Sequence, residues 1–373
     1  MTFPASPSNN EVYVANSGSQ WIYNNVNDTW SKYSTANGSA YVASPIEAMA
    51  VHNLFINGNM EVSQQNGNTS SNTAGHYPAD QTYMYNNFGN CSSWQDTTVP
   101  NSNYSKSIVL SQGASSPATN STSFTEISQY LEGTYFKKLG WGTADAQDLT
   151  IGFWARCSSD LTFSSALPSS SADRIHIEEH NLTGNTWTWI NYVIPAQTGG
   201  TWYSNTSVGC SFRIYATLGT DYHGSTGWNS SSKYGTANAT QFDDLGAGNT
   251  FHTTGWVMIP GNHTIAEEDS WKFQLPMDYE LRRCKRYWNI YNKSQGVLYD
   301  FYHLGTAYDT TNFSLQEEMR IVPTITQTWS GGTNLNSNQI YYATTNTFQV
   351  LLRSTATGRA YIYLQDIITN ARL

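Results

Sequence analysis

Apolar and polar residues alternate in short runs along most of the chain, a pattern typical of β-strands rather than helices. The segment 149–156 shows it well, because Leu149, Ile151, Phe153 and Ala155 fall on one face of a strand. Similar runs, separated by loops rich in Ser, Thr, Asn and Gly, predict strands at 107–112, 125–131, 149–156, 174–180, 186–194, 210–218 and 255–259. Strands of this length and spacing predict an all-β sandwich.

The stretch 53–65 predicts the first strand of this domain. It opens with an apolar run at 54–56, which Asn57-Gly58 follows. Both of those residues tolerate positive φ, so we expect a turn there. Strand alternation then restarts at Met60. Two later segments, 67–75 and 221–248, predict long loops, and long loops at the rim of a rigid sheet often carry recognition.

The patterning divides the chain into four parts. Residues 1–33 predict a small β-hairpin module, with strands at 11–14 and 20–23 and with Trp30 closing it. A linker that can include a helical turn follows at 34–52. The main β-domain covers 53–276, and a short helix followed by a C-terminal β-sheet extension covers 277–373. In the last part we expect a helix over 278–288, capped by Asp278, and strands at 296–305, 313–325, 339–343, 348–353 and 360–365, the final two as a hairpin.

Composition narrows the function classes. Charged residues make up 12% of the chain, against about 25% in typical soluble domains. Aromatic residues reach 14%, with 25 Tyr and 13 Trp. This balance suits extracellular β-proteins and sugar contact, where aromatic faces and neutral polar groups bind the ligand. The formal net charge of −9 argues against nucleic acid, which needs clustered Lys and Arg.

The four cysteines, Cys91, Cys157, Cys210 and Cys284, have no Cys-x-x-Cys spacing, so we expect no zinc site. We expect free, mostly buried thiols, as in a protein assembled in a reducing cytoplasm. The N-terminal sequence does not resemble a signal peptide, and no run of about 18 apolar residues predicts a membrane span.

Candidate catalytic patterns are weak. His176-Ile-Glu-Glu-His180 matches an inverted zinc-protease motif, but the chemistry needs both histidines on one helix face, and the local alternation predicts a strand with these histidines on a polar outer face. Adjacent carboxylates such as Glu178-Glu179 point to opposite faces of a strand, so they are no evidence for a glycosidase pair. We therefore predict no catalytic residues, no metal ligands and no cofactor.

Six segments in order resemble a jelly-roll module of phage tail-fibre and other virion proteins, similar to carbohydrate-binding modules. They are Asn53-Leu-x-x-Asn57-Gly58-x-Met60, Tyr77-Pro-Ala-Asp80, Ile127-Ser-Gln-x-Leu131-Glu132, Leu149-Thr-Ile-Gly-Phe-Trp-Ala-Arg156, Glu280-Leu-x-x-Cys284-x-Arg286-Tyr-Trp288 and Glu318-Met-Arg-x-x-Pro323-Thr-Ile325. The resemblance implies a jelly-roll β-sandwich over 53–276.

The resemblance also implies a function: a non-enzymatic bacteriophage virion protein, most simply a tail fibre that attaches to host-surface glycan. It implies a homotrimer, and other virion proteins as partners of the N-terminal module. Such a protein is assembled in the bacterial cytoplasm and acts outside the cell, without nucleic acid binding or membrane insertion. Two alternatives stay open, a purely structural capsid fibre or tail adaptor and a glycan depolymerase.

Aromatic residues in or beside the predicted loops are the candidate glycan ligands, because a flat ring stacks on the apolar face of a pyranose. Trp228 is the strongest candidate, since it lies in the polar segment 224–230. The alternative interpretation, which fits most of them, is core or subunit-interface packing. The full set is Trp187, Trp189, Trp202, Tyr203, Tyr222, Trp228 and Tyr234.

Overall fold

The computed structural model describes residues 12–14, 20–24, 29–33, 53–87, 89–114, 118–230, 232–291, 297–306 and 308–373. The chain divides into two compact units, Met1–Ala48 and Met49–Leu373. The predicted linker, 34–52, lies outside the described residues.

The first unit contains a three-stranded antiparallel sheet rather than the expected hairpin. Its order is β1 (Val12–Val14), β2 (Gln20–Asn24) and β3 (Thr29–Tyr33). Trp30 does not merely close a hairpin, because it lies within β3 and pairs with Tyr23 of β2.

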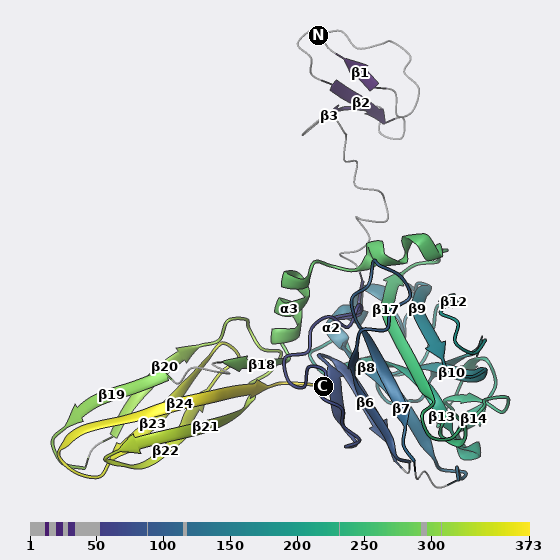
Figure 1. Cartoon of the computed structure of the whole chain (residues 1–373). Coiled ribbons are helices and arrows are strands. Elements are labelled where there is room, and N and C mark those ends of the chain that lie inside the picture. Colours follow the sequence, from purple (N-terminus) through teal and green to yellow (C-terminus); the bar gives the residue numbers. More distant parts are fainter. Residues whose placement is uncertain are drawn as a thin grey trace. The chain divides into compact units, whose positions relative to one another are not determined.

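The second unit begins with a jelly-roll sandwich of two antiparallel sheets, which confirms the predicted all-β fold (Figure 1). The seven-stranded sheet has the order β15 (Gly227–Asn229), β11 (Ile175–Leu182), β10 (Leu161–Pro168), β13 (Val208–Leu218), β8 (Phe124–Glu132), β5 (Thr82–Asn86) and β4 (His76–Ala79). The five-stranded sheet has the order β12 (Thr188–Ile194), β9 (Leu149–Cys157), β17 (Thr250–Pro260), β7 (Ser107–Gln112) and β6 (Cys91–Asp96).

One apolar core fills the space between these sheets. Phe153 and Phe212 face each other across it with ring centroids 5.7 Å apart, and Trp256 packs against Phe212 at 5.2 Å. All three side chains are fully buried. The seven strands predicted from periodicity correspond to β7, β8, β9, β11, β12, β13 and β17.

Short helices and bridges connect the strands of the jelly roll. These are α2 (Gly133–Phe136), η1 (Lys137–Leu139), η2 (Thr220–Tyr222), β14 (His223–Gly224), β16 (Gly235–Thr236) and η3 (Phe242–Asp244), while η4 (Glu267–Phe273) follows the last strand, β17. β14 and β16 pair in parallel within the predicted 221–248 loop.

The opening stretch is not a strand, although periodicity predicts one. The turn at Asn57 is confirmed, with φ at 58°, and Met60 adopts a positive φ of 60° as well. Side-chain amides replace a strand ladder here. Gln129 of β8 accepts from the backbone N–H of Ile56 at 2.8 Å and donates to its carbonyl at 2.8 Å.

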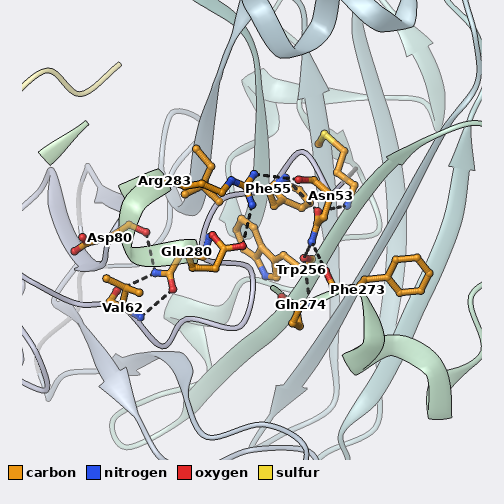
Figure 2. A network of polar contacts seen from close by, with 12 residues as sticks. Asn53, Phe55, Val62, Asp80, Trp256, Phe273, Gln274, Glu280 and Arg283 are labelled. Carbon is orange, nitrogen blue, oxygen red and sulfur yellow. Dashed lines mark hydrogen bonds and ion pairs between the residues drawn. The ribbon is translucent and has the colours of Figure 1, made fainter. Parts of the chain in front are cut away.

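A buried polar network joins this opening stretch to α3 (Met277–Lys285), as Figure 2 shows. Asn53 donates through Nδ2 to the carbonyls of Trp256 and Phe273, at 3.0 and 3.2 Å. Glu280 accepts from the backbone N–H of Asn57 at 2.7 Å and from Arg283 at 2.8 Å. We call the four residues Asn53, Asn57, Glu280 and Arg283 the joint network. Asp278 lies in the first turn of α3 without capping it, because the N-cap position is Pro276.

Residues after α3 form a second β-sandwich. One sheet centres on β24 (Gly358–Asn370), which pairs with β18 (Trp288–Tyr291), β19 (Val297–His303) and β21 (Thr324–Thr333). The other has the order β20 (Tyr308–Ser314), β23 (Thr347–Ser354) and β22 (Leu335–Ala343). Leu315, Met319, Phe348, Val350, Leu352, Ile367 and Ala371 form the buried core between them.

Two sequence predictions about this sandwich are wrong. The single strand expected at 313–325 is divided between β20 and β21, with no strand over 315–323. The strands expected as a terminal hairpin, β23 and β24, belong to different sheets. Both carry buried apolar residues, so they pack across the core instead of pairing edge to edge.

The expectation about the cysteines is confirmed. Cys91, Cys157, Cys210 and Cys284 are free and buried. Within the described ranges, no helix has the length and apolar character needed to cross a membrane.

Candidate functional site

The outer face of the seven-stranded sheet carries aromatic side chains where a solvent-facing sheet normally carries charges. Strand register aligns them, because Tyr85 of β5, Glu126 of β8 and Tyr215 of β13 lie directly across from one another. In the next row Tyr83 and Arg213 flank Ser128. We call this surface the aromatic face; it comprises Tyr77, Tyr83, Tyr85, Phe124, Tyr130, Tyr215, Tyr222 and Tyr234, with Glu126 and Arg213 between them.

The rings of the aromatic face form a continuous series. Tyr77 and Tyr83 have centroids 5.3 Å apart, and Tyr83 and Tyr85 stack at 6.1 Å. Tyr85 stacks on Phe124 at 5.5 Å. Phe124 then meets Tyr222 edge-on at 5.9 Å. Each of these five rings is partly exposed, so the series offers an apolar, rigid surface to a flat ligand.

Arg213 is the polar centre of this surface. Its guanidinium lies 5.6 Å from the ring centroids of both Tyr130 and Tyr234. Nε donates to Ser211 at 2.9 Å, and Nη1 donates to the Tyr215 hydroxyl at 3.3 Å. The side chain keeps 22% of its surface exposed, so it is held in place while remaining open to a ligand.

Glu126 compensates the charge of Arg213 from below. Its Oε2 lies 3.5 Å from Arg213 Nη1, and its side chain is 4% exposed. Burial alone would lower the pKa of Arg213, but Tyr215, Glu126 and Tyr130 outweigh it and the pKa lies above its usual value. The pair therefore presents hydrogen-bond donors without net charge.

Burial keeps the hydroxyls of Tyr83, Tyr130 and Tyr234 neutral at physiological pH. Burial raises the pKa of Tyr83 to about 12, and the neighbouring phenols and Glu126 act in the same direction. Burial also raises the pKa values of Tyr130 and Tyr234, although Arg213 opposes the rise at both. Neutral phenols both donate and accept hydrogen bonds, as sugar hydroxyls require.

Of the seven predicted ligand residues, only Tyr222 and Tyr234 lie on the aromatic face. Trp187 and Trp189 lie on the outer side of the five-stranded sheet, against Trp154. Trp189 Nε1 donates to the carbonyl of Ile265 at 2.9 Å, which fixes it beneath the segment that precedes η4.

The other three candidates lie near the edge of the core. Trp228 is partly buried within β15; its ring lies 5.6 Å from Trp141 and 6.2 Å from Trp202, and Nε1 donates to the Pro195 carbonyl at 3.2 Å. These contacts give it a packing role, because they occupy its ring edges and its one donor. Tyr203, by contrast, is 46% exposed.

Sequence reasoning missed most of the aromatic face, including Tyr83, Tyr85 and Tyr130, as well as Arg213. A signal was nevertheless present. In β5, Tyr83 and Tyr85 alternate with Met84, and a strand with aromatic residues on its non-core side marks a surface kept for binding. Tyr83 and Tyr85 lie within a strand, so a criterion based on loop aromatics excludes them.

The His176–His180 motif lies on β11, so the predicted strand is confirmed. The histidines, however, lie on the core side of this strand and not on its outer side. His180 points into the core, 5.5 Å from the Phe153 ring, and bonds Ser165 at 2.8 Å. Ile177 packs on the opposite, outer side. This arrangement arises because the 219–236 loop covers the outer side of β11. Within the described residues no group of three or more His, Cys, Asp or Glu is placed to hold a metal ion.

A cavity of about 680 Å³ lies beside the joint network. Its lining includes Tyr135, Tyr279 and Arg283, together with Arg286. Arg283 is paired with Glu280, and Arg286 with Glu132 at 3.0 Å. Because those charges are already matched inside the protein, this cavity is a weaker candidate than the aromatic face.

No known family model matches the chain, and no curated protein matches its sequence. Solved structures with similar topology include a family 61 carbohydrate-binding module in complex with β-1,4-galactotriose, at 11% identity, covering 56% of this chain and 98% of the module, with a TM-score of 0.27. A xylan-binding domain from Paenibacillus barcinonensis matches at 8% identity over 57% of this chain and 96% of the domain, with a TM-score of 0.28.

An arabinose-bound α-L-arabinofuranosidase matches at 13% identity over 60% of this chain, with a TM-score of 0.30. The match spans 29% of that enzyme's length. All these TM-scores are below 0.5, so the fold assignment rests on the sheet order and register described above.

Proposed function

We propose that the protein is a non-enzymatic glycan-binding protein whose ligand lies across the aromatic face. The observation that carries the proposal is the series of partly exposed rings from Tyr77 to Tyr222, with the Arg213–Glu126 pair beside it. Aromatic rings stack on sugar rings, and a charge-neutral donor group bonds their hydroxyls. The low fraction of charged residues in the chain, 12%, is consistent with such a ligand.

A hydrolytic role is less well supported. Glycoside hydrolysis requires two carboxyl groups that flank the scissile bond, roughly 5–10 Å apart. On the aromatic face Glu126 is buried beneath Arg213 and already paired with it. A depolymerase acting elsewhere on the molecule is the alternative that activity assays on bound glycans would reveal.

The biological setting we propose is attachment of a bacteriophage particle to its host, most simply as a trimeric tail fibre. This rests on the six segments that resemble virion jelly rolls. A structural virion component without a receptor is the competing role.

Binding to surface glycan is tested with purified full-length protein on intact bacteria, with and without periodate oxidation, together with its mass in solution. We expect periodate-sensitive binding by a trimer. Absence of binding, with assembly only alongside other virion proteins, would leave the structural role instead.

A glycan array then tests the site. Replacement of Tyr83 and Tyr85 by Ala is expected to weaken binding by about tenfold or more, or about 1.4 kcal/mol. The matched control is Tyr302→Ala with Tyr341→Ala, which removes two exposed tyrosines of the C-terminal sandwich and is expected to leave binding unchanged. Equal loss in both proteins would contradict the assignment.

A further inference from the structure

The aromatic face is open over one part of the sheet and covered over another. Within the loop 219–236, the residues on either side of β15 lie on the outer side of β10 and β11, where Ala166, Ile175 and Ile177 are buried under Tyr222 and Tyr234. The exposed rings therefore lie over β4, β5 and β8, and the loop forms a wall beside β13.

This wall is fixed by many contacts. The N–H of Tyr234 donates to the Tyr222 carbonyl at 2.8 Å, and Lys233 Nζ donates to the Asp221 carbonyl at 2.9 Å. Thr236 bonds both Ser164 and Glu179. A Cβ at Gly235 would lie 2.6 Å from Leu218, so the loop sits directly against the sheet at this residue. A glycan chain that follows the ring series therefore cannot continue past this point.

A cavity of about 220 Å³ lies where the ring series meets the wall. Its lining consists of Phe124, Arg213, Tyr215, Leu218, Tyr222 and Tyr234. This volume corresponds to about seven liquid water molecules and is below the range of about 300–1,000 Å³ for pockets that take drug-sized ligands. It has room for one sugar ring rather than for a stretch of chain.

Arg213 is the cation among the described residues that line this cavity. Arg213 is paired with Glu126. On the wall, Lys233 binds the Asp221 backbone, and the Asp221 carboxylate accepts from Ser121 at 3.1 Å. No cation of the described residues that line this cavity is left uncompensated to bind a sialate or uronate carboxylate.

We propose that this cavity receives the terminal sugar of a neutral glycan, with Arg213 as the hydrogen-bond donor to its hydroxyls and the preceding sugars stacked along Tyr85 and Tyr83. The proposal rests on the glycan-binding function proposed above and deepens it: the protein recognises chain ends rather than internal stretches.

The test uses the full-length protein and a neutral oligosaccharide identified on the array, free, blocked with a bulky group at its reducing end, or blocked at its non-reducing end. We expect one blocked form to bind about tenfold or more weakly and the other to bind within about twofold of the free form. We also expect the uronic-acid-terminated counterpart to bind about tenfold or more weakly. Equal binding of the free form and both blocked forms would overturn end recognition.

Tyr234→Ala opens the wall and removes one ring of the aromatic face, so we expect it to bind every form more weakly and to bind the two blocked forms equally. Tyr302→Ala is the control and is expected to keep the end preference. Tyr83- and Tyr85-dependent binding without end preference would overturn this inference alone. Absence of any glycan binding by the wild-type protein would overturn the proposed function as well.

Discussion

The buried histidines show how single residues link the core of the jelly roll to pH. Burial lowers the pKa of His180 to about 3, and those of His176 and His252 to about 4. Ser165 and Tyr192 form a hydrogen-bonded group with His180, which satisfies the neutral imidazole. A histidine of this kind serves packing, and its spacing in sequence resembles a metal motif only by coincidence.

We therefore predict that acid weakens the fold through His180. Its folded-state pKa lies below its unfolded value, so its stabilising contribution is complete above about pH 6.5 and is lost as the pH falls toward 3. Between pH 7.5 and 4.5 the loss amounts to about 2–3 kcal/mol. The free energy of unfolding is measured with denaturant at both pH values. Between them we expect His180→Gln to lose about 2–3 kcal/mol less stability than the wild type does.

The same comparison separates His180 from other titrating groups. Burial raises the pKa values of Asp80 and Asp243, whose contribution has the opposite sign and is lost as the pH rises. Those groups are present in both proteins. Parallel pH profiles of the wild type and His180→Gln would contradict the role assigned to His180.

At the scale of elements, polar side chains replace regular structure at the start of the jelly roll. Asn57 donates through Nδ2 to the carbonyls of Val62 and Asp80, at 2.8 and 3.0 Å, and its Oδ1 accepts from Val62 N–H at 2.9 Å. Glu132 of β8 accepts from both Arg286 and Tyr287. The segments that resemble the virion jelly roll thus bond to one another across the sequence.

Asn57→Asp is expected to destabilise the protein by at least about 2 kcal/mol, because a carboxylate cannot donate and would face two buried carbonyls. The free energy of unfolding measures this. Asn101→Asp is the matched control, since the exposed Asn101 side chain only accepts, from Asn103 N–H at 3.0 Å. Equal stability of the two variants would contradict the role assigned to the Asn57 side chain.

Strand positions were predictable where alternation was clear, as in β9. β10 was not predicted because both of its faces are buried. Ser164 and Ala166 lie under the 219–236 loop, and Ser165 lies in the core. The sequence also could not predict that β23 and β24 pair with other strands. Alternation alone does not distinguish a hairpin from two strands that pack across a core. Closure of the aromatic face by the 219–236 loop depends on tertiary packing that local sequence does not encode.

At the scale of the whole second unit, the jelly roll and the C-terminal sandwich are held together by specific bonds. Arg320 donates to the carbonyls of Thr206 and, at 2.9 Å, Ala371. Arg372 lies over the Tyr77 ring at 3.8 Å and donates to Gln65 at 2.6 Å. Tyr77, at one end of the aromatic face, therefore packs against the C-terminal residue Arg372.

The most direct test of the central claim is hydroxyl-radical footprinting of the full-length protein with and without its bound glycan. We expect protection to concentrate at Tyr83, Tyr85, Tyr130 and Tyr234, with no change at Tyr203. Protection at Trp228, or at Tyr279 in the lining of the 680 Å³ cavity, with the aromatic face unchanged, would contradict the account and place the ligand elsewhere.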